Sequence, residues 1–253
     1  MKITEYKMTA SVEAFKGKTF ALISDLHGES PKETIEALKK IAPDYILAPG
    51  DIFEPLMPYN DELNKSGFEL LTEAAKVAPT FYSLGNHEIG GNRSWSPKWK
   101  LAKGKKRACT EENIERIKAT GVYFLDDEVI ELDGISFGGL SSGLITDDNK
   151  PNLNFVEAFS ALATPKVLVC HHPEYYKKYL KGKGIELIVS GHAHGGQWRI
   201  FGRGIFAPGQ GLFPKYTSGV FDNTLVVSRG LREKSIVPRI FNPTEVVKIV
   251  FEK

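Results

Sequence analysis

The chain has 253 residues, which is enough for one large α/β domain or two small ones. Hydrophobic residues make up 42% and charged residues 25%, as in a globular protein with a full core, and the formal net charge of +2 is too small for bulk attraction to nucleic acid. No apolar run near the start has the length of a signal peptide, and none reaches the roughly 20 residues of a membrane span. We therefore expect a cytoplasmic protein.

Five short apolar runs, rich in branched and aromatic residues, predict buried strands. They cover residues 18–24, 45–48, 80–84, 166–170 and 185–190. The helix predicted after the first run begins with a capping-box pattern at residues 30–33, with Pro31 at its first position. Further helices are predicted over residues 61–76, 111–119 and 154–162. This alternation of strands and helices is typical of an α/β protein.

The C-terminal third has a different pattern. Residues 217–220 and 224–228 flank an Asp222-Asn223 turn and predict a hairpin, and residues 245–251 predict a closing strand. Mixed strands after the alternating part indicate two sheets packed together. Because the sequence shows no internal repeat and no long linker, we predict a single domain over residues 1–253.

The chain contains two cysteines. Cys109 follows a basic segment and Cys170 ends an apolar run, so we expect an exposed thiol and a buried one. Two reduced thiols fit a cytoplasmic protein better than a disulfide.

Each predicted strand ends at polar residues. These ends read Asp25-Leu26-His27, Gly50-Asp51, Gly85-Asn86-His87-Glu88, His171-His172-Pro173 and Gly191-His192-Ala193-His194-Gly195-Gly196. Binding groups of an open α/β sheet gather at the carboxyl ends of its strands. All six histidines lie in these segments, and imidazole with carboxylate suits divalent zinc, iron or manganese. The glycines before the ligands allow sharp turns and close backbone approach.

The ordered set Asp-x-His, Gly-Asp, Gly-Asn-His-Glu, His and Gly-His-x-His, from Asp25 to Gly196, resembles that of the calcineurin-like metallophosphoesterases. The segment His194-Gly195-Gly196-Gln197, with residues 206–216 and 240–243, is similar to a bacterial branch with membrane-associated phosphodiesterases and UDP-diacylglucosamine pyrophosphatase-like enzymes. The resemblance implies an α/β fold, a four-layer α/β/β/α sandwich of two packed mixed sheets flanked by helices. It also implies a phosphodiesterase, phosphomonoesterase or pyrophosphatase.

The resemblance also implies a ligand set for two divalent transition metal ions, manganese, zinc or iron. One ion would take Asp25, His27 and His194, and the other would take Asn86, His171 and His192. Asp51 would bridge the two ions, and a shared carboxylate reduces their mutual repulsion. A hydroxide held between the ions would be the nucleophile.

Three neighbouring side chains receive other expectations. His87 resembles the family's non-ligand histidine and would act at the leaving group as proton donor or cation. Glu54 stands where the family usually has aspartate, and two interpretations stay open: it orients His87, or it is a surface carboxylate. His172 leaves its strand on the opposite side from His171, so we expect it to pack or to support the site.

The expected substrate is a phosphorylated small molecule or a lipid-linked phosphoester. Residues 93–107 hold seven basic residues, no acidic residue, and Trp95 and Trp99. Composition alone favours a solvated loop; the alternative is recruitment of an anionic, partly apolar substrate or of an anionic membrane, which would make the protein peripheral to the membrane.

Two other functions stay open. A nuclease would need an extended basic groove with stacking aromatic side chains, and only residues 93–107 offer that pattern, so a nucleic-acid partner is not expected. A non-catalytic metal-binding scaffold of the same fold would be expected to lack ligands, whereas all seven ligand positions and His87 are filled here.

Overall fold

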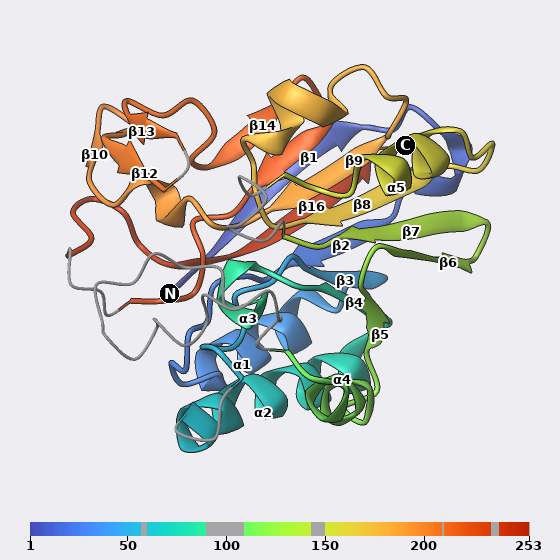
Figure 1. Cartoon of the computed structure of the whole chain (residues 1–253). Helices are drawn as coiled ribbons and strands as arrows, with labels where there is room; N and C mark the ends of the chain where they lie inside the picture. The colour runs from blue at the N-terminus through green and yellow to red at the C-terminus, as the bar shows by residue number, and fades with distance from the viewer. Residues whose placement is uncertain (57–59, 90–108, 143–149, 209, 234–237, 253) are drawn as a thin grey trace.

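Two six-stranded sheets form the centre of the computed structural model, which describes residues 1–56, 60–89, 109–142, 150–208, 210–233 and 238–252 (Figure 1). The basic segment 93–107 lies outside the described residues. The first sheet has the order β1 (Lys2–Thr9), β16 (Glu245–Glu252), β2 (Thr19–Leu22), β3 (Tyr45–Ala48), β4 (Thr80–Ser83) and β5 (Tyr123–Leu125). Strands β2 to β5 are parallel, and β16 runs antiparallel to β2.

The second sheet has the order β14 (Gly219–Phe221), β15 (Leu225–Val227), β9 (Leu187–Ser190), β8 (Lys166–Cys170), β7 (Ile135–Leu140) and β6 (Glu128–Leu132). Its four central strands are parallel, and an antiparallel strand lies at each edge. Residues Asp222, Asn223 and Thr224 join β14 to β15, since Phe221 pairs with Leu225. Asp222 and Asn223 have φ angles of 52° and 50°, as the central residues of a type I′ turn require, and the Thr224 N–H donates to the Phe221 carbonyl oxygen at 3.0 Å. The predicted hairpin is therefore confirmed.

The side chains of each strand alternate between two hydrophobic layers, because successive residues point to opposite faces of a sheet. In β2, Phe20 and Leu22 lie in the layer between the two sheets, whereas Ala21 lies in the layer beneath the helices. Phe81 of β4 stacks on Phe137 of β7 with ring centroids 3.7 Å apart, which joins one sheet to the other. The predicted packing of two mixed sheets is confirmed.

Helices cover both outer faces (Figure 1). The helices α1 (Lys32–Ile41), α2 (Asp61–Val77) and α4 (Glu111–Lys118) share a core layer with the first sheet. The helix α5 (Leu153–Ser160) and the single π-helical turn η5 (Tyr176–Leu180) share another with the second sheet. These layers produce the α/β/β/α sandwich that the family resemblance implies. The single domain over residues 1–253 stays a prediction.

Two local expectations were wrong. The helix α1 begins at Lys32, Pro31 takes the N-cap position, and no side chain caps the first turn, because the helix starts one residue later than the capping pattern requires. Cys109 is buried rather than exposed, since it packs in the layer between the first sheet and its helices. Neither cysteine forms a disulfide bond.

Among the described helices, none combines the length and the apolar character that crossing a bilayer requires.

We expect the contact between Phe81 and Phe137 to carry much of the cohesion between the sheets. Phe137→Ala should lower the free energy of unfolding by about 3–5 kcal/mol, because it leaves a cavity in a fully buried layer. Urea denaturation measures this loss. The control, Val129→Ala on the exposed side of β6, should change stability by less than about 0.5 kcal/mol. A loss below about 1 kcal/mol for Phe137→Ala would contradict a tightly packed intersheet layer.

Candidate metal centre

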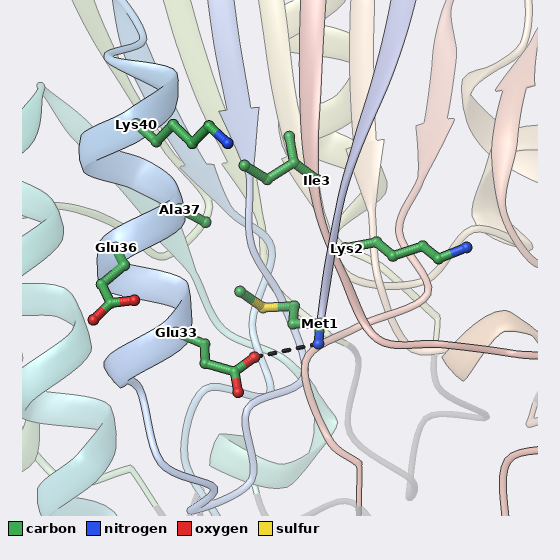
Figure 2. A pocket seen from close by; sticks show the side chains of 7 residues that line it. All are labelled: Met1, Lys2, Ile3, Glu33, Glu36, Ala37 and Lys40. Atoms are coloured by element: carbon green, nitrogen blue, oxygen red, sulfur yellow. Dashed lines mark hydrogen bonds and ion pairs between the residues drawn. The ribbon is translucent and has the colours of Figure 1, made fainter.

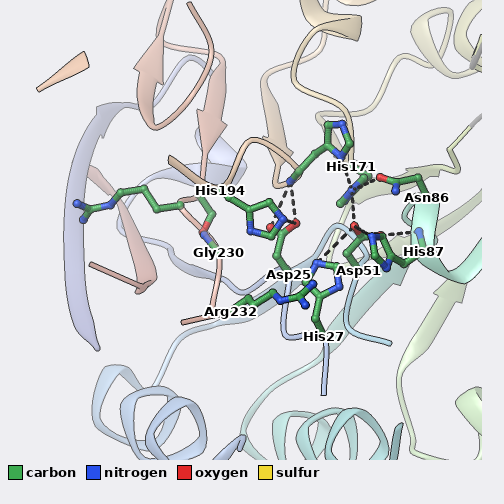
Figure 3. Close-up of polar contacts among 12 residues, drawn as sticks. Asp25, His27, Asp51, Asn86, His87, His171, His194, Gly230 and Arg232 are labelled. Atoms are coloured by element: carbon green, nitrogen blue, oxygen red, sulfur yellow. Dashed lines mark hydrogen bonds and ion pairs between the residues drawn. The ribbon is translucent and has the colours of Figure 1, made fainter. Parts of the chain in front are cut away.

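The structure brings the predicted ligand residues together at the carboxyl ends of strands from both sheets. Asp25, Asp51 and Asn86 follow β2, β3 and β4 of the first sheet. His171 follows β8 of the second sheet, and His192 follows β9. The predicted ligands therefore come from both sheets. Figure 3 shows side chains from both sheets converging on one place.

Three side chains surround the Nε2 atom of His171. This atom lies 3.2 Å from Asp51 Oδ2, 3.0 Å from Asn86 Oδ1 and 3.1 Å from His192 Nδ1. Its other ring nitrogen, Nδ1, lies 2.7 Å from the carbonyl oxygen of Pro49 and donates to it. That bond leaves Nε2 free to bind a metal ion, as the outer partners of metal-binding histidines usually do.

A second group lies on the other side of Asp51. Donor atoms of Asp25, His27 and His194 lie within 4.8 Å of one another. The Asp25 Oδ1 atom is 3.7 Å from His194 Nε2, and Asp51 Oδ2 is 3.6 Å from His27 Nε2. The Asp51 carboxylate therefore lies between the two groups, as a bridging ligand must.

The backbone around these groups is strained. Five of the seven predicted ligands have a left-handed conformation: Asp25 (φ 56°), His27 (φ 51°), Asp51 (φ 51°), His192 (φ 64°) and His194 (φ 44°). Each such residue costs roughly 1–2 kcal/mol when it is not glycine. Strain of this kind concentrates at functional sites, where other contacts must offset it.

Two glycines allow the strand ends to approach closely. A Cβ atom on Gly85 would lie 2.3 Å from Asp51 Oδ1, and one on Gly191 would lie 2.5 Å from Asp25 Oδ2. Any larger residue at either position would displace a predicted ligand. The sequence-based expectation for these glycines is confirmed.

Burial determines the charge state of most of these imidazoles. It is the main cause that lowers the pKa of His27, His192 and His194, so these rings are neutral, which is the form that binds metal. Burial acts in the same direction on His171, but the Asp51 carboxylate outweighs it and raises the pKa of His171 to about 10.

The residues present fit a pair of divalent transition metal ions. The Nε2 atom of the fully buried His27 side chain has no hydrogen-bond partner among the described residues, although buried polar atoms are normally paired. A metal ion would satisfy such a nitrogen. The donor set of imidazoles, carboxylates and one amide oxygen suits zinc, iron or manganese.

His87 lies beside this centre and is held by Glu54. Its Nδ1 atom is 2.9 Å from Glu54 Oε2, and its ring centroid is 4.3 Å from that of His27. Burial alone would lower the pKa of His87, but the Asp51 and Glu54 carboxylates outweigh it and raise the pKa. Glu54 also lies 3.3 Å from His27 Nδ1 and from an Arg232 guanidinium nitrogen. Its side chain is largely buried, so this geometry favours the orienting role over that of a surface carboxylate.

Glu88 supports the centre in a way that the sequence did not indicate. Its buried carboxylate accepts the backbone N–H groups of Asp51 (2.9 Å), Phe53 (3.0 Å) and Gly85 (2.9 Å). Burial and the nearby Asp51 charge raise the pKa of Glu88 to about 7. In the sequence, Glu88 stands out only as the last residue of the Gly-Asn-His-Glu segment, and that position does not predict the backbone groups to which its carboxylate binds.

The C-terminal segment 230–232 also contributes. The backbone N–H of Arg232 donates to the Asp25 carbonyl oxygen at 2.8 Å, and Gly230 lies so close that a Cβ atom there would be 2.8 Å from Asp25 Cβ. Figure 3 shows the Arg232 side chain beside His27. No sequence motif marked this segment.

His172 contacts Glu174, Tyr175 and His192. Its Nδ1 atom lies 3.2 Å from Glu174 Oε1, and its ring packs on Tyr175 and on His192 with centroids 4.7 Å and 4.4 Å apart. Donor atoms of His172, Glu174 and His192 also lie within 4.8 Å of one another. The packing agrees with the supporting position expected for His172.

A separate surface pocket of about 440 Å³ contains none of these residues. It lies between α1 and β1, and Figure 2 shows its lining, including Met1, Ile3, Glu33 and Ala37. Among the described residues, the N-terminal ammonium group pairs there with Glu33 Oε2 at 3.2 Å.

Comparison with known proteins agrees with the geometry. Residues 18–196 match the calcineurin-like phosphoesterase family. The chain is 26% identical over 208 residues to YpbG, an uncharacterized protein of Bacillus subtilis, covering 79% of this chain and 70% of that protein. It is 28% identical over 165 residues to the phosphodiesterase YaeI of Escherichia coli, covering 62% of this chain and 51% of that protein. It is 23% identical over 237 residues to an uncharacterized metallophosphoesterase of Helicobacter pylori, covering 89% of this chain and 57% of that protein. It thus spans only about half the length of these last two relatives. The chain belongs to the calcineurin-like phosphoesterase family of metal-dependent phosphoric ester hydrolases.

Proposed function

We propose that this chain hydrolyses phosphoester bonds at a centre of two divalent ions, manganese, zinc or iron, around the Asp51 carboxylate. The position of Asp51 Oδ2 carries this proposal, since it lies 3.2 Å from the His171 imidazole on one side and 3.6 Å from the His27 imidazole on the other. When bound, such an ion pair activates water as the nucleophile and polarises the phosphoryl oxygens.

The side chains divide into two ligand groups in this proposal. Asp25, His27 and His194 hold one ion, and Asn86, His171 and His192 hold the other. Asp51 contributes to both groups and offsets the repulsion between the two ions. Asp25 and Asp51 are the only anionic ligands in this set, so two divalent ions would leave the centre with net positive charge, which favours a phosphate anion.

His87 would act at the leaving group. The Glu54 carboxylate accepts a hydrogen bond from Nδ1 and fixes the ring, so that Nε2 faces the Asp51 side of the centre at 4.0 Å. We infer that Nε2–H donates its proton to the departing oxygen, or stabilises its negative charge. Glu54 is then a positioning residue, whose longer side chain reaches His87 in place of the family's aspartate.

The substrate class that we propose is a phosphorylated small molecule or a lipid-linked phosphoester. The test is a screen of protein stripped with a chelator and reloaded with manganese, zinc or iron. It would include p-nitrophenyl phosphate, bis-p-nitrophenyl phosphate, cyclic nucleotides, nucleotide-diphosphate lipids and single-stranded DNA. Activity should vanish on stripping and return with metal on at least one phosphoester. Hydrolysis that survives stripping would contradict the proposal, and a strong preference for DNA would favour a nuclease.

Asp51→Asn should abolish detectable hydrolysis and reduce the bound metal. The amide lacks the negative charge that offsets the two ions, so both sites weaken together. Elemental analysis after gel filtration measures metal per chain, alongside turnover of bis-p-nitrophenyl phosphate. Asp61→Asn, on the exposed first turn of α2, is the matched control and should retain both. Full metal content in Asp51→Asn would mean that this carboxylate does not bridge.

His87→Asn should retain the bound metal while lowering turnover by ~10²–10⁴-fold, the usual contribution of a general acid. Loss of metal would instead assign His87 as a metal ligand. That assignment is geometrically possible, because donor atoms of His27, Asp51 and His87 lie within 4.8 Å of one another.

Glu54→Gln tests the positioning role. If Glu54 acts through His87, the single variant should lower turnover, and the double variant should be little slower than His87→Asn alone. Independent, additive losses of turnover would contradict that role.

A further inference from the structure

Three phenylalanines occupy exposed turns in left-handed backbone conformations. Phe201, Phe213 and Phe241 are 102%, 77% and 85% exposed, with φ angles of 49°, 51° and 52°. Glycine and asparagine are the residues that favour this conformation, and a bulky side chain there is uncommon. The backbone strain disfavours the folded state, and a ring that stays exposed buries no apolar area to offset it. Such outliers point to a function that requires the ring at that place.

The three phenylalanines belong to one part of the molecule, which we call the apolar lobe and define as residues 197–208, 210–216 and 238–242. It holds two small hairpins, β10 (Arg199–Ile200) with β11 (Arg203–Gly204), and β12 (Phe206–Ala207) with β13 (Gly211–Leu212). A bridge between Trp198 and Ile240 joins the third segment to the first. Figure 1 shows β10, β12 and β13 together at one end of the molecule.

Other apolar side chains of the lobe are exposed as well. Phe206 pairs with Leu212 across its hairpin, and these side chains are 47% and 71% exposed. Trp198, Ile200 and Ile240 are each 44–55% exposed. Exposed apolar groups gathered in this way mark an interaction surface rather than ordinary scatter.

The charge of the lobe indicates the kind of partner. The lobe has four basic residues, Arg199, Arg203, Lys215 and Arg239, and no acidic residue. Arg203 and Lys215 are exposed beside the phenylalanine turns. Aromatic rings flanked by basic side chains suit the boundary between lipid headgroups and acyl chains, where the rings insert and the cations meet anionic headgroups.

Hydrogen bonds connect the lobe to the metal centre. The Asn242 amide, next to Phe241, donates to the carbonyl oxygens of His194 (2.7 Å) and Gln197 (3.1 Å). The Arg199 guanidinium donates to the Gly195 carbonyl oxygen at 2.8 Å. The lobe begins at Gln197, three residues after the predicted metal ligand His194. A bilayer or protein that binds the lobe would therefore lie next to the metal centre.

We propose that the apolar lobe inserts the Phe201, Phe213 and Phe241 rings into an anionic lipid bilayer and so presents the centre to phosphoesters at the membrane surface. The location of the substrate rests on the proposed hydrolysis; the contact with the bilayer does not. A second copy of this chain is the other occupant that such a surface could accept, and the test separates the two.

The experiment compares the manganese-loaded full chain with the triple variant Phe201→Asn, Phe213→Asn, Phe241→Asn. Both are sedimented with vesicles of phosphatidylcholine alone and with equimolar phosphatidylcholine and phosphatidylglycerol. The unchanged chain should bind the mixed vesicles more tightly. The triple variant should bind them at least about tenfold more weakly, since it loses three inserted rings. Its thermal midpoint should be equal or higher, because asparagine tolerates the left-handed conformation.

Two controls keep the result specific. Val129→Asn and Leu153→Asn alter apolar side chains of 40% and 46% exposure outside the lobe and should leave vesicle binding unchanged. The double variant Arg203→Glu, Lys215→Glu should reduce the preference for anionic vesicles. Hydrolysis of soluble bis-p-nitrophenyl phosphate should be the same in the triple variant as in the unchanged chain.

Three outcomes would overturn the proposal: no binding of the unchanged chain to mixed vesicles, undiminished binding of the triple variant, or a stable oligomer that the triple variant dissociates while no vesicle is bound. Vesicle binding without hydrolysis of any phosphoester in the screen, soluble or lipid-linked, would instead refute the proposed function and leave the bilayer contact standing. Hydrolysis of a phosphoester without vesicle binding would refute the bilayer contact and leave the proposed function standing.

Discussion

The Asp51 carboxylate is the point on which the rest of the site depends. One of its oxygens lies between imidazoles that come from different sheets, 3.2 Å from His171 and 3.6 Å from His27. This contact requires the carboxyl ends of β3 and β8 to meet, and hence requires the two sheets to pack face to face. The hydrophobic layer between the sheets, with Phe81 stacked on Phe137, holds them in that position.

The centre opposes folding in several ways. Five of its residues have left-handed backbone conformations, and Asp25 and Asp51 are almost wholly buried. Contacts from outside the ligand set offset part of that cost. Glu88 accepts three backbone N–H groups around Asp51, and the His192 backbone N–H donates to the Asp25 carboxylate at 3.0 Å. A centre strained in this way is already arranged for its ligand, which reduces the reorganisation needed when metal binds.

Much of this arrangement could be predicted from sequence. The strands β2, β3, β4, β8 and β9 are buried on both faces, so they read as continuous apolar runs, and each ends at the polar residues that form the centre. The strand β1 was missed because its side chains are mostly exposed and polar, and its pairing with β16 joins residues more than 240 positions apart. The strands β5, β6 and β7 were missed as well, since they are short or carry charged residues and glycine.

The contributions of single residues were harder to anticipate. Glu88, Gly230 and Arg232 act through backbone contacts, which depend on the tertiary structure and leave no pattern in the sequence. The sequence leaves two roles open for Glu54, and the 2.9 Å contact with His87 favours the one in which it orients that ring. Phe201, Phe213 and Phe241 read as ordinary hydrophobic residues, because neither their exposure nor their φ angles follow from composition.

Anomalous diffraction from crystals loaded with manganese tests the central claim most directly, because it locates each ion without reference to activity. The account predicts two peaks, one on each side of the Asp51 carboxylate, the first next to His27 and His194 and the second next to His171 and His192. A single peak away from Asp51, or no peak in fully loaded protein, would contradict it.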